Sequence, residues 1–210
     1  MKISWQGHAS FIIESEDIIL VTDPFDEQVG YPHICQQADV VTVSHQHWDH
    51  DAVQVFKNSP RILMGPGLFQ YGHMFFHGLP SWHDSQQGAV RGTNTIFIIE
   101  AEGMKIVHLG DLGHVPEQQA DMIGQPDILL LPVGGTYTLD AEKAWQTAEL
   151  LQPRLIIPMH YRTSVCKLDI LPLEPFVERC PDFTKKPYLE MKADQLASLT
   201  GAVLVLDYLH

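Results

Sequence analysis

The stretch that decides the fold is residues 38–50, ADVVTVSHQHWDH. Its first seven residues are almost continuously apolar or β-branched, a pattern typical of a β-strand that is covered on both faces. Three histidines and one aspartate follow within six positions, at His45, His47, Asp49 and His50. Because functional groups favour the ends of strands, we expect this segment to carry the site.

These four side chains predict a metal site. Imidazole nitrogen and carboxylate oxygen bind zinc, manganese or iron at about 2.0–2.2 Å, and an ordinary core has no use for so many unpaired polar groups. The alternative is a solvated, histidine-rich loop. The apolar strand before the motif and the further ligand candidates after it argue against that alternative.

Three further candidate ligands come at or just beyond predicted strand ends. They are His83 in SWHD, Asp111 in GDLGH and His160 in IPMHY. Seven ligands from four segments are too many for one tetrahedral ion and enough for two ions that share a carboxylate. The count therefore predicts two divalent metal ions, with zinc as the default and manganese or iron as alternatives.

The whole chain predicts one compact domain over residues 1–210. Hydrophobic residues make up 45% and charged residues 19% of the sequence, near the globular average, and no linker-like segment interrupts it. Lysines and arginines number 13 against 26 aspartates and glutamates, so the net charge is −13. Such a charge repels phosphate backbones, so we expect a small-molecule substrate and no nucleic-acid partner.

The start of the chain lacks the apolar stretch of a signal peptide, and no later run approaches the about 18 apolar residues of a membrane span. We therefore expect a soluble cytoplasmic protein without a membrane partner; a homo-oligomer is compatible with the sequence. Cys35, Cys166 and Cys180 are odd in number and widely spaced, which indicates reduced structural thiols.

Strand signals are spread along the chain and helix signals come late. Besides residues 38–44, the predicted strands are Ile3–Trp5, Phe11–Glu14, Ile18–Thr22, Arg61–Met64, Met74–His77, Thr95–Glu100, Met104–Leu109, Ile128–Leu131, Leu155–Pro158 and Val203–Leu206. One short helix is predicted between Pro116 and Gly124, and a stronger one over Asp140–Leu151. This order indicates two central sheets with helices outside.

The motifs together resemble the metallo-β-lactamase superfamily. The resemblance rests on HxHxDH at 45–50, the downstream histidine, the GD aspartate and the final PMH histidine. Within that superfamily, a bacterial and archaeal branch of metal-dependent hydrolases is similar to WQGHAS at 5–10, TDPF at 22–25, HLGDLGH at 108–114 and PVGGTYT at 132–138. That branch is similar to ascorbate-phosphate lactonases and, more distantly, to N-acyl phosphatidylethanolamine phospholipase D.

The resemblance implies an α/β fold, a four-layer αββα sandwich with metals at one edge. It implies a first ion on His45, His47 and His83, and a second ion on Asp49, His50 and His160. Asp111 would bridge the two ions, and a hydroxide between them would be the nucleophile.

Other polar residues have candidate supporting roles. Asp49 could also orient or deprotonate the attacking water, while His114 or Tyr137 could stabilise charge or donate a proton to the leaving group. Tyr137 is equally well explained as a turn residue. Asp23 is expected to accept from a metal-bound histidine. A last group is expected to be ordinary surface, core or supporting histidines: His73, His77 and His108.

We therefore predict a dinuclear metal-dependent hydrolase that activates water to attack a small ester, lactone or phosphoester. Arg91 and Arg162 could meet an anionic group of the substrate, although each is more often a surface ion-pairing residue. The alternatives are a non-catalytic metal or ligand sensor and a metal-dependent phosphodiesterase or nuclease. A di-iron oxidoreductase is disfavoured because His47 stands where such proteins have glutamate, and because no flavodoxin-like domain follows.

Overall fold

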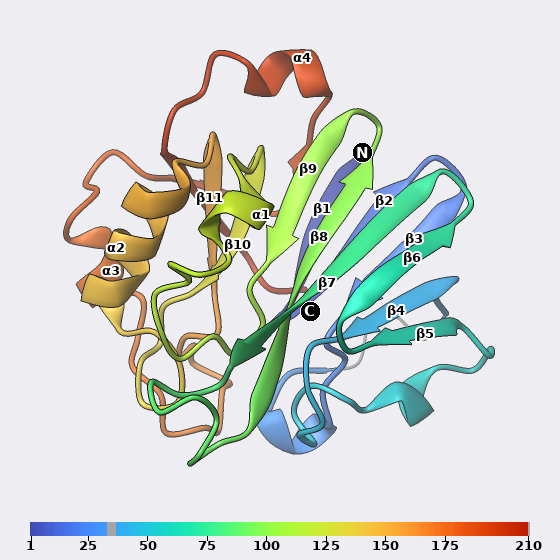
Figure 1. The fold of residues 1–210 in the computed structure, drawn as a ribbon, viewed down its shortest axis with the longest axis horizontal. Helices are drawn as coiled ribbons and strands as arrows, with labels where there is room; N and C mark the ends of the chain where they lie inside the picture. Colours follow the sequence, from blue (N-terminus) through green and yellow to red (C-terminus); the bar gives the residue numbers. More distant parts are fainter. Residues whose placement is uncertain (33–36, 210) are drawn as a thin grey trace.

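The protein is described by a computed structural model over residues 1–32 and 37–209 (Figure 1). Two β-sheets form its centre. The six-stranded sheet has the order β13-β1-β2-β3-β4-β5, with bounds Leu189–Glu190, Lys2–Gly7, Ser10–Ser15, Ile18–Thr22, Val40–Val43 and Arg61–Met64. The eight-stranded sheet has the order β12-β14-β11-β10-β9-β8-β7-β6, with bounds Thr184–Lys186, Ala202–Leu206, Leu155–Met159, Ile128–Pro132, Met104–His108, Thr93–Ala101, Met74–Trp82 and Gly67–Tyr71.

The two sheets share one hydrophobic core. Phe11 and Leu20 of the smaller sheet and Phe76 and Phe97 of the larger one belong to the same cluster, and each is almost fully buried. Strands β4, β10 and β11 are buried at every position, as expected for strands that are covered on both faces. The larger sheet thus has covered central strands, and the helical segments Ala120–Ile123, Ala141–Leu151 and Glu174–Val177 lie beside β10 and β11 (Figure 1).

The helices are few and short. They are α1 (Ala120–Ile123), α2 (Ala141–Leu151), α3 (Glu174–Val177) and α4 (Ala193–Leu196). The predicted helix α2 starts after Asp140, whose side chain accepts from the backbone N–H of Lys143, and it buries Ala144 and Leu151 against the core. The predicted helix between Pro116 and Gly124 is only one turn long, and Gly124 ends it as expected.

The outer face of the smaller sheet is covered differently. Val41 and Val43 of β4 pack there on Phe56, and Val53 and Val55 of a 3₁₀ turn, η2 (Val53–Val55), pack beside them. This outer layer is therefore thin. The predicted fold class, a mixed α/β fold with two sheets inside and helices outside, is confirmed.

Parallel strands bring the candidate ligands to one edge. Strands β3 and β4 pair in parallel, and so do β9, β10 and β11. The carboxyl ends of parallel neighbours lie at the same edge of a sheet, so the residues that follow β3 and β4 gather at one edge of the smaller sheet and those that follow β9 and β11 at one edge of the larger sheet. The contact between His50 and Asp111 shows that these two edges lie together. In the part of the chain that the structure describes, no helix is long and apolar enough to cross a membrane.

Two sequence predictions differ from the structure around one hairpin. β7 is nine residues long rather than four, and β6 was not predicted. Pro80 lies inside β7, but β6 pairs only with residues 74–78, so the missing N–H of Pro80 falls where β7 has one neighbour. Cys166 and Cys180 are free, and Cys35 lies outside the described residues.

Candidate metal centre

The first predicted ligand set, His45, His47 and His83, is assembled by β4 and β7. His45 and His47 follow β4, and His83 follows β7. His45 Nε2 lies 3.0 Å from His47 Nδ1, and the His83 ring centroid is 4.8 Å from that of His45 and 5.2 Å from that of His47. One ligand atom from each residue can be chosen so that all three lie within 4.8 Å of one another. The three predicted side chains thus gather as one group.

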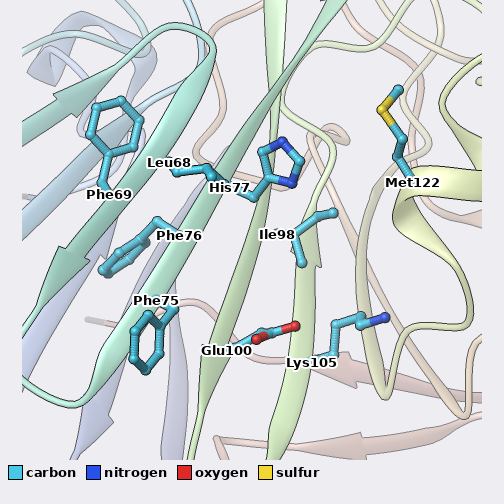
Figure 2. Close-up of a pocket in the computed structure, with 9 residues that line it drawn as sticks. All are labelled: Leu68, Phe69, Phe75, Phe76, His77, Ile98, Glu100, Lys105 and Met122. Atoms are coloured by element: carbon cyan, nitrogen blue, oxygen red, sulfur yellow. The ribbon is translucent and has the colours of Figure 1, made fainter.

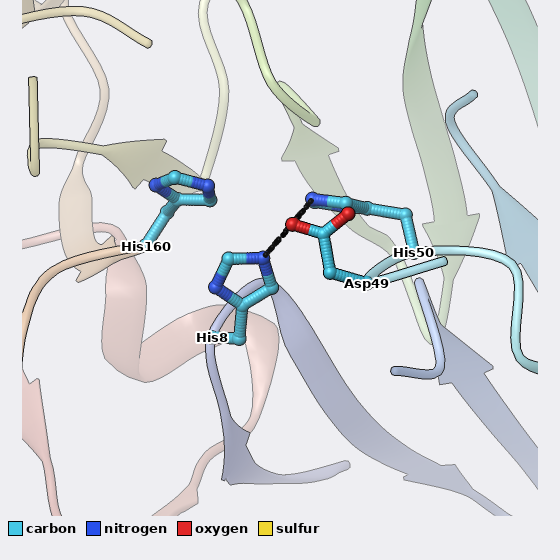
Figure 3. Close-up of side chains that lie close together, drawn as sticks. All are labelled: His8, Asp49, His50 and His160. Carbon is cyan, nitrogen blue, oxygen red and sulfur yellow. Dashed lines mark hydrogen bonds and ion pairs between the residues drawn. The ribbon is translucent and has the colours of Figure 1, made fainter. Parts of the chain in front are cut away.

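The second predicted set also gathers, and a fourth residue joins it. Asp49, His50 and His160 lie together with His8, with ligand atoms all within 4.8 Å of one another (Figure 3). His8 Nε2 is 3.2 Å from Asp49 Oδ2 and 3.1 Å from His50 Nε2. The structure thus brings together every predicted member of this set and adds His8 from the β1–β2 turn.

Asp111 lies between the two groups. Its Oδ2 is 3.2 Å from His83 Nε2 in the first group and 3.2 Å from His160 Nε2 in the second. Its Oδ1 is 3.2 Å from His50 Nε2. One buried carboxylate thus faces both histidine groups, the position that a bridging ligand requires.

Backbone conformations at the site are unusual. His8, Asp23 and His160 are non-glycine residues with positive φ angles of 54°, 38° and 53°. Each such residue costs on the order of 1–3 kcal/mol and persists where the surroundings determine it. The His8 carbonyl accepts from His160 N at 2.9 Å and from Trp5 Nε1 at 3.0 Å, which ties two of these residues together.

Gly134 allows the chain after β10 to pass close to the backbone of His160. A Cβ at Gly134 would collide with the carbonyl oxygen of His160, so a side chain cannot be accommodated without moving the backbone of a candidate ligand. Gly134 follows β10, whose neighbour β11 carries His160. The lack of a side chain at Gly134 therefore permits a close contact between two backbones beside His160.

Asp23 orients His50. Its Oδ1 accepts from Ser44 N at 2.8 Å, and its Oδ2 accepts from Ser44 Oγ at 2.6 Å and from His50 Nδ1 at 2.9 Å. Burial alone would raise the pKa of Asp23, but nearby His108, His50 and His45 hold it below its usual value. An ionised carboxylate only accepts, so His50 Nδ1 carries a proton and Nε2 faces Asp111. The structure thus places Asp23 where the sequence analysis expected a supporting carboxylate.

Burial and neighbouring charges shift the pKa values of the other histidines and aspartates at the site. Burial is the main cause that lowers the pKa of His45 to about 3 and of His8 to about 4, so both rings are neutral at neutral pH. Burial works against the charge on Asp49 and Asp111, but the surrounding histidines keep both pKa values below the ordinary range. The neutral imidazole of His45 beside the ionised carboxylates of Asp49 and Asp111 is the protonation state that metal binding requires, whereas His50, whose pKa the neighbouring carboxylates raise, has a proton to lose.

The residues fit two metal ions. Asp111 Oδ1 and both ring nitrogens of His160 are buried and make no well-aligned hydrogen bond among the described residues, although Asp111 Oδ1 lies 3.2 Å from His50 Nε2 and His160 Nε2 lies 3.2 Å from Asp111 Oδ2. Neighbouring ligand atoms lie 3.0–3.2 Å apart. Bonds of about 2.0–2.1 Å in a tetrahedral site place ligand atoms roughly 3.3 Å from each other, so these separations are close to those that metal coordination requires.

The cleft in front of the metal groups has a volume of about 290 Å³. It is lined by His47, Trp48, Asp49, His83, Arg91, Asp111, Tyr137 and Leu168. Tyr137 therefore lies where a substrate would contact it. His114 does not line this cleft: its Nδ1 lies 2.9 Å from the carbonyl oxygen of Val115, and it borders a separate hollow with Trp82 and Asp84.

The remaining histidines lie outside the metal groups. His108 Nε2 lies 2.8 Å from the carbonyl oxygen of Ala9 in the core, and His73 Nε2 lies 2.8 Å from Ser15 Oγ. His77 borders another hollow, on the outer face of the larger sheet, among apolar side chains such as Phe75 and Met122 (Figure 2). These positions agree with the supporting, surface and core roles expected for them.

One residue of the second group, His8, was not predicted from the sequence to lie there. It lies 37 residues before His45 and belongs to no ligand spacing, because the β1–β2 turn carries it to the second group. The available signal was the motif WQGHAS, in which a histidine follows a glycine at a predicted strand end. WQGHAS draws attention to His8, but the motif alone does not indicate what His8 does.

Comparison with known proteins agrees with this geometry. The profile of the Beta-lactamase superfamily domain matches residues 2–160, and the two sheets with a histidine and aspartate centre at one edge are those of the metallo-β-lactamase class. Two relatives are UPF0173 metal-dependent hydrolases. The one from Archaeoglobus fulgidus is 33% identical over 223 aligned positions, which cover 89% of this chain and 90% of the relative. The one from Pyrococcus abyssi is 31% identical over 193 positions, covering 78% and 85%.

A solved structure extends the comparison. A protein from Thermotoga maritima, assigned as a Zn-dependent hydrolase of the metallo-β-lactamase superfamily, is 37% identical. It superposes with a TM-score of 0.80 over 99% of both chains. This chain belongs to the UPF0173 metal-dependent hydrolases of the metallo-β-lactamase superfamily. It is a metal-dependent hydrolase.

Proposed function

We propose that this hydrolase binds two divalent ions, zinc by default, and hydrolyses a small ester, lactone or phosphoester. The first ion would be held by His45, His47 and His83, and the second by Asp49, His50 and His160. The observation that carries the proposal is the position of Asp111, whose carboxylate lies 3.2 Å from His83 on one side and 3.2 Å from His160 on the other. Manganese or iron are the alternative ions.

The chain's own residues supply the rest of the chemistry. When bound, the two ions polarise the substrate and lower the pKa of water from 15.7 toward about 7. Asp49 lines the cleft, where it orients the attacking water and accepts a proton from that water. Tyr137 lines the same cleft and donates a proton to the leaving group. His114 borders a different hollow, so we assign it no direct role in this step.

His8 positions Asp49. His8 is fully buried and neutral, so one of its ring nitrogens carries the only proton. Its Nδ1 has no partner among the described residues, and an orphaned N–H is less well tolerated in a core than an orphaned lone pair. The proton therefore belongs on Nε2, 3.2 Å from Asp49 Oδ2. We assign His8 the role of a donor that fixes the direction of this carboxylate.

The experiment combines metal analysis with turnover. The purified, metal-replete protein is analysed for metal content and assayed against p-nitrophenyl phosphodiesters, lactones and carboxylic esters. We expect two ions per chain and hydrolysis of at least one class. Asp111→Asn should hold no more than one ion and lose at least about 100-fold in kcat/KM. The matched control is Asp127→Asn, a carboxylate that accepts from Lys105 N and Arg154 Nε rather than from histidine.

Other outcomes would contradict the proposal. Fewer than one ion per chain after metal-replete growth would remove its basis. Two bound ions with no turnover of any class would favour the metal or ligand sensor instead. Cleavage restricted to phosphodiesters would favour the phosphodiesterase or nuclease alternative. The expected single domain, cytoplasmic location and small-molecule substrate complete the proposal.

A further inference from the structure

The loop that follows His83 is built around one buried carboxylate. Asp84 is only 5% exposed, and it accepts four backbone N–H groups: from Gln86 at 2.7 Å, Gly88 at 3.0 Å, Val90 at 3.0 Å and Arg91 at 2.7 Å. The loop also closes on itself through His83 N and Gly92 O at 3.1 Å. Its backbone is therefore held in one conformation beside a candidate metal ligand, and Arg91 is the last residue that Asp84 holds.

The side chain of Arg91 reaches across the cleft entrance. Its Nη2 donates to the carbonyl oxygen of Thr136 at 3.2 Å, and its guanidinium lies 5.5 Å from the centroid of the Tyr137 ring. A guanidinium has five N–H donors in a planar fork, and one hydrogen bond leaves most of them for another acceptor. Within the described residues, no carboxylate lies within ion-pair distance of this guanidinium.

Arg91 also lines two hollows beside the metal groups. It lines the cleft of about 290 Å³ and a neighbouring hollow of about 370 Å³, and His47 lines both as well. Among the described residues that line the two, Arg91 is the one lysine or arginine. The larger hollow has no aspartate or glutamate in that described lining. In a protein with a net charge of −13, the sign is thus reversed in the larger hollow, whereas the cleft itself also holds the two candidate ligands Asp49 and Asp111.

The second arginine considered from the sequence is placed differently. Arg162 has an exposed side chain, its backbone forms a bridge with Pro172, and it lines neither hollow. The structure thus separates two arginines that the sequence could not rank. The one that lies at the metal centre is also the one whose backbone is fixed by a buried carboxylate.

We propose that Arg91 forms an anion-binding subsite, so that the substrate carries a carboxylate or phosphate group besides the bond that is hydrolysed. The planar fork of Arg91 pairs with two oxygens of the anion, and the face of Tyr137 holds the guanidinium in place. This inference rests on the proposed hydrolysis at the adjacent ions. It names the class of substrate that the cleft selects.

A purely structural role for Arg91 has different consequences. As a link between the 84–92 loop and the 133–138 loop, the side chain contributes one hydrogen bond and one exposed contact with an aromatic ring. Loss of such a link would affect charged and neutral substrates alike. An anion subsite would affect the charged ones alone, so the ratio of the two rates distinguishes the roles.

The experiment uses three substrates that differ only at the end remote from the scissile bond. They are p-nitrophenyl hydrogen adipate, which carries a carboxylate, its neutral methyl ester, and a p-nitrophenyl hexanoate with a terminal phosphate. The metal-loaded full chain should show a kcat/KM at least tenfold higher for an anionic substrate than for the neutral one. The carboxylate and phosphate arms then show which anion the subsite prefers.

The variants test the residue itself. Arg91→Ala should reduce the ratio of anionic to neutral kcat/KM at least tenfold, mainly through KM, and Arg91→Lys should restore only part of it because an ammonium lacks the fork. The control is Arg179→Ala, an equal charge change at an exposed arginine after α3. Its ratio should equal that of the unchanged protein. All variants are compared at equal metal content.

The inference and the proposed function can fail separately. Equal rates on anionic and neutral esters, or an unchanged ratio in Arg91→Ala, would overturn the anion subsite and leave hydrolysis intact. If no ester is hydrolysed, calorimetry with monomethyl adipate and dimethyl adipate replaces the rates. Binding of the anion that weakens at least tenfold in Arg91→Ala would support the subsite, and binding that is absent or unaffected would overturn it.

Discussion

Asp23→Asn tests how the fold prepares the second metal group. The substitution would keep the shape of the side chain, and asparagine tolerates the positive φ of 38° at this position. The new amide oxygen would still accept from Ser44 N. The amide nitrogen would replace the oxygen that accepts from His50 Nδ1 at 2.9 Å, and two donors would then face each other. With the second ion bound, His50 carries one proton, and it can relieve the conflict only by moving that proton to Nε2, the atom that faces Asp111 and the ion.

The expected loss of affinity for the second ion in Asp23→Asn follows from two independent estimates. A hydrogen bond to a charged group contributes about 1.5–3 kcal/mol. Partners of metal-bound histidines contribute about 10–100-fold in metal affinity, which corresponds to roughly 1.4–2.8 kcal/mol. We therefore expect the second ion to bind about 10–100-fold more weakly in Asp23→Asn, while the first ion is retained.

The assay is a competition titration with a chelator of known affinity, read by metal analysis. Asp127→Asn is the control, because Asp127 also accepts from a backbone N–H but lies with Lys105 and Arg154. Affinity for the second ion within twofold of the unchanged protein in Asp23→Asn would refute the reasoning. So would an equal loss in Asp127→Asn, because the effect would then be one of general stability.

Three other predictions concern the same site. Removal of both ions by a chelator should lower the melting temperature by on the order of 20 °C, since each ion at 1,000 times its Kd stabilises by about 4 kcal/mol and each kcal/mol is worth roughly 2–4 °C in a chain of this size; a shift below 2 °C in differential scanning calorimetry would count against it. His8→Ala should weaken the second ion about 10–100-fold and His8→Gln should recover part of that affinity, because its amide can donate to Asp49; equal losses in both variants by chelator competition would remove the donor role. Burial lowers the pKa of His50, but Asp111, Asp23 and Asp49 outweigh it and raise that pKa well above 6.5, so His50 must lose a proton when the second ion binds. Affinity should then rise about tenfold per pH unit below that pKa, and calorimetry in buffers of different ionisation enthalpy should detect one released proton, whereas none would contradict the assignment.

The residues that could be predicted from the sequence share one property: the signal is local. The apolar run before His45 predicts the covered strand β4, and the spacing of Ala144, Ala148 and Leu151 predicts α2 with its cap at Asp140. Strand β6 shows the opposite case. Leu68 is 79% exposed, so this edge strand has little apolar pattern, and the glycines at both of its ends indicate turns instead.

In the site, too, the residues that could be predicted are those with a local sequence signal. The seven candidate ligands come directly after strands, and because parallel strands end at one edge, a strand prediction already brings most of them together. His8 and Arg91 could not be placed in this way. His8 is carried by a tight turn with a left-handed residue, and the position of Arg91 depends on four hydrogen bonds to Asp84 that no periodicity encodes.

The central claim is that Asp111 joins two metal groups. The most direct measurement is anomalous diffraction from crystals of the metal-replete protein, recorded on both sides of the zinc absorption edge. We expect two anomalous peaks, one among His45, His47 and His83 and one among Asp49, His50 and His160, each within about 2.2 Å of an Asp111 oxygen. A single peak, or two peaks of which either does not contact Asp111, would contradict the account.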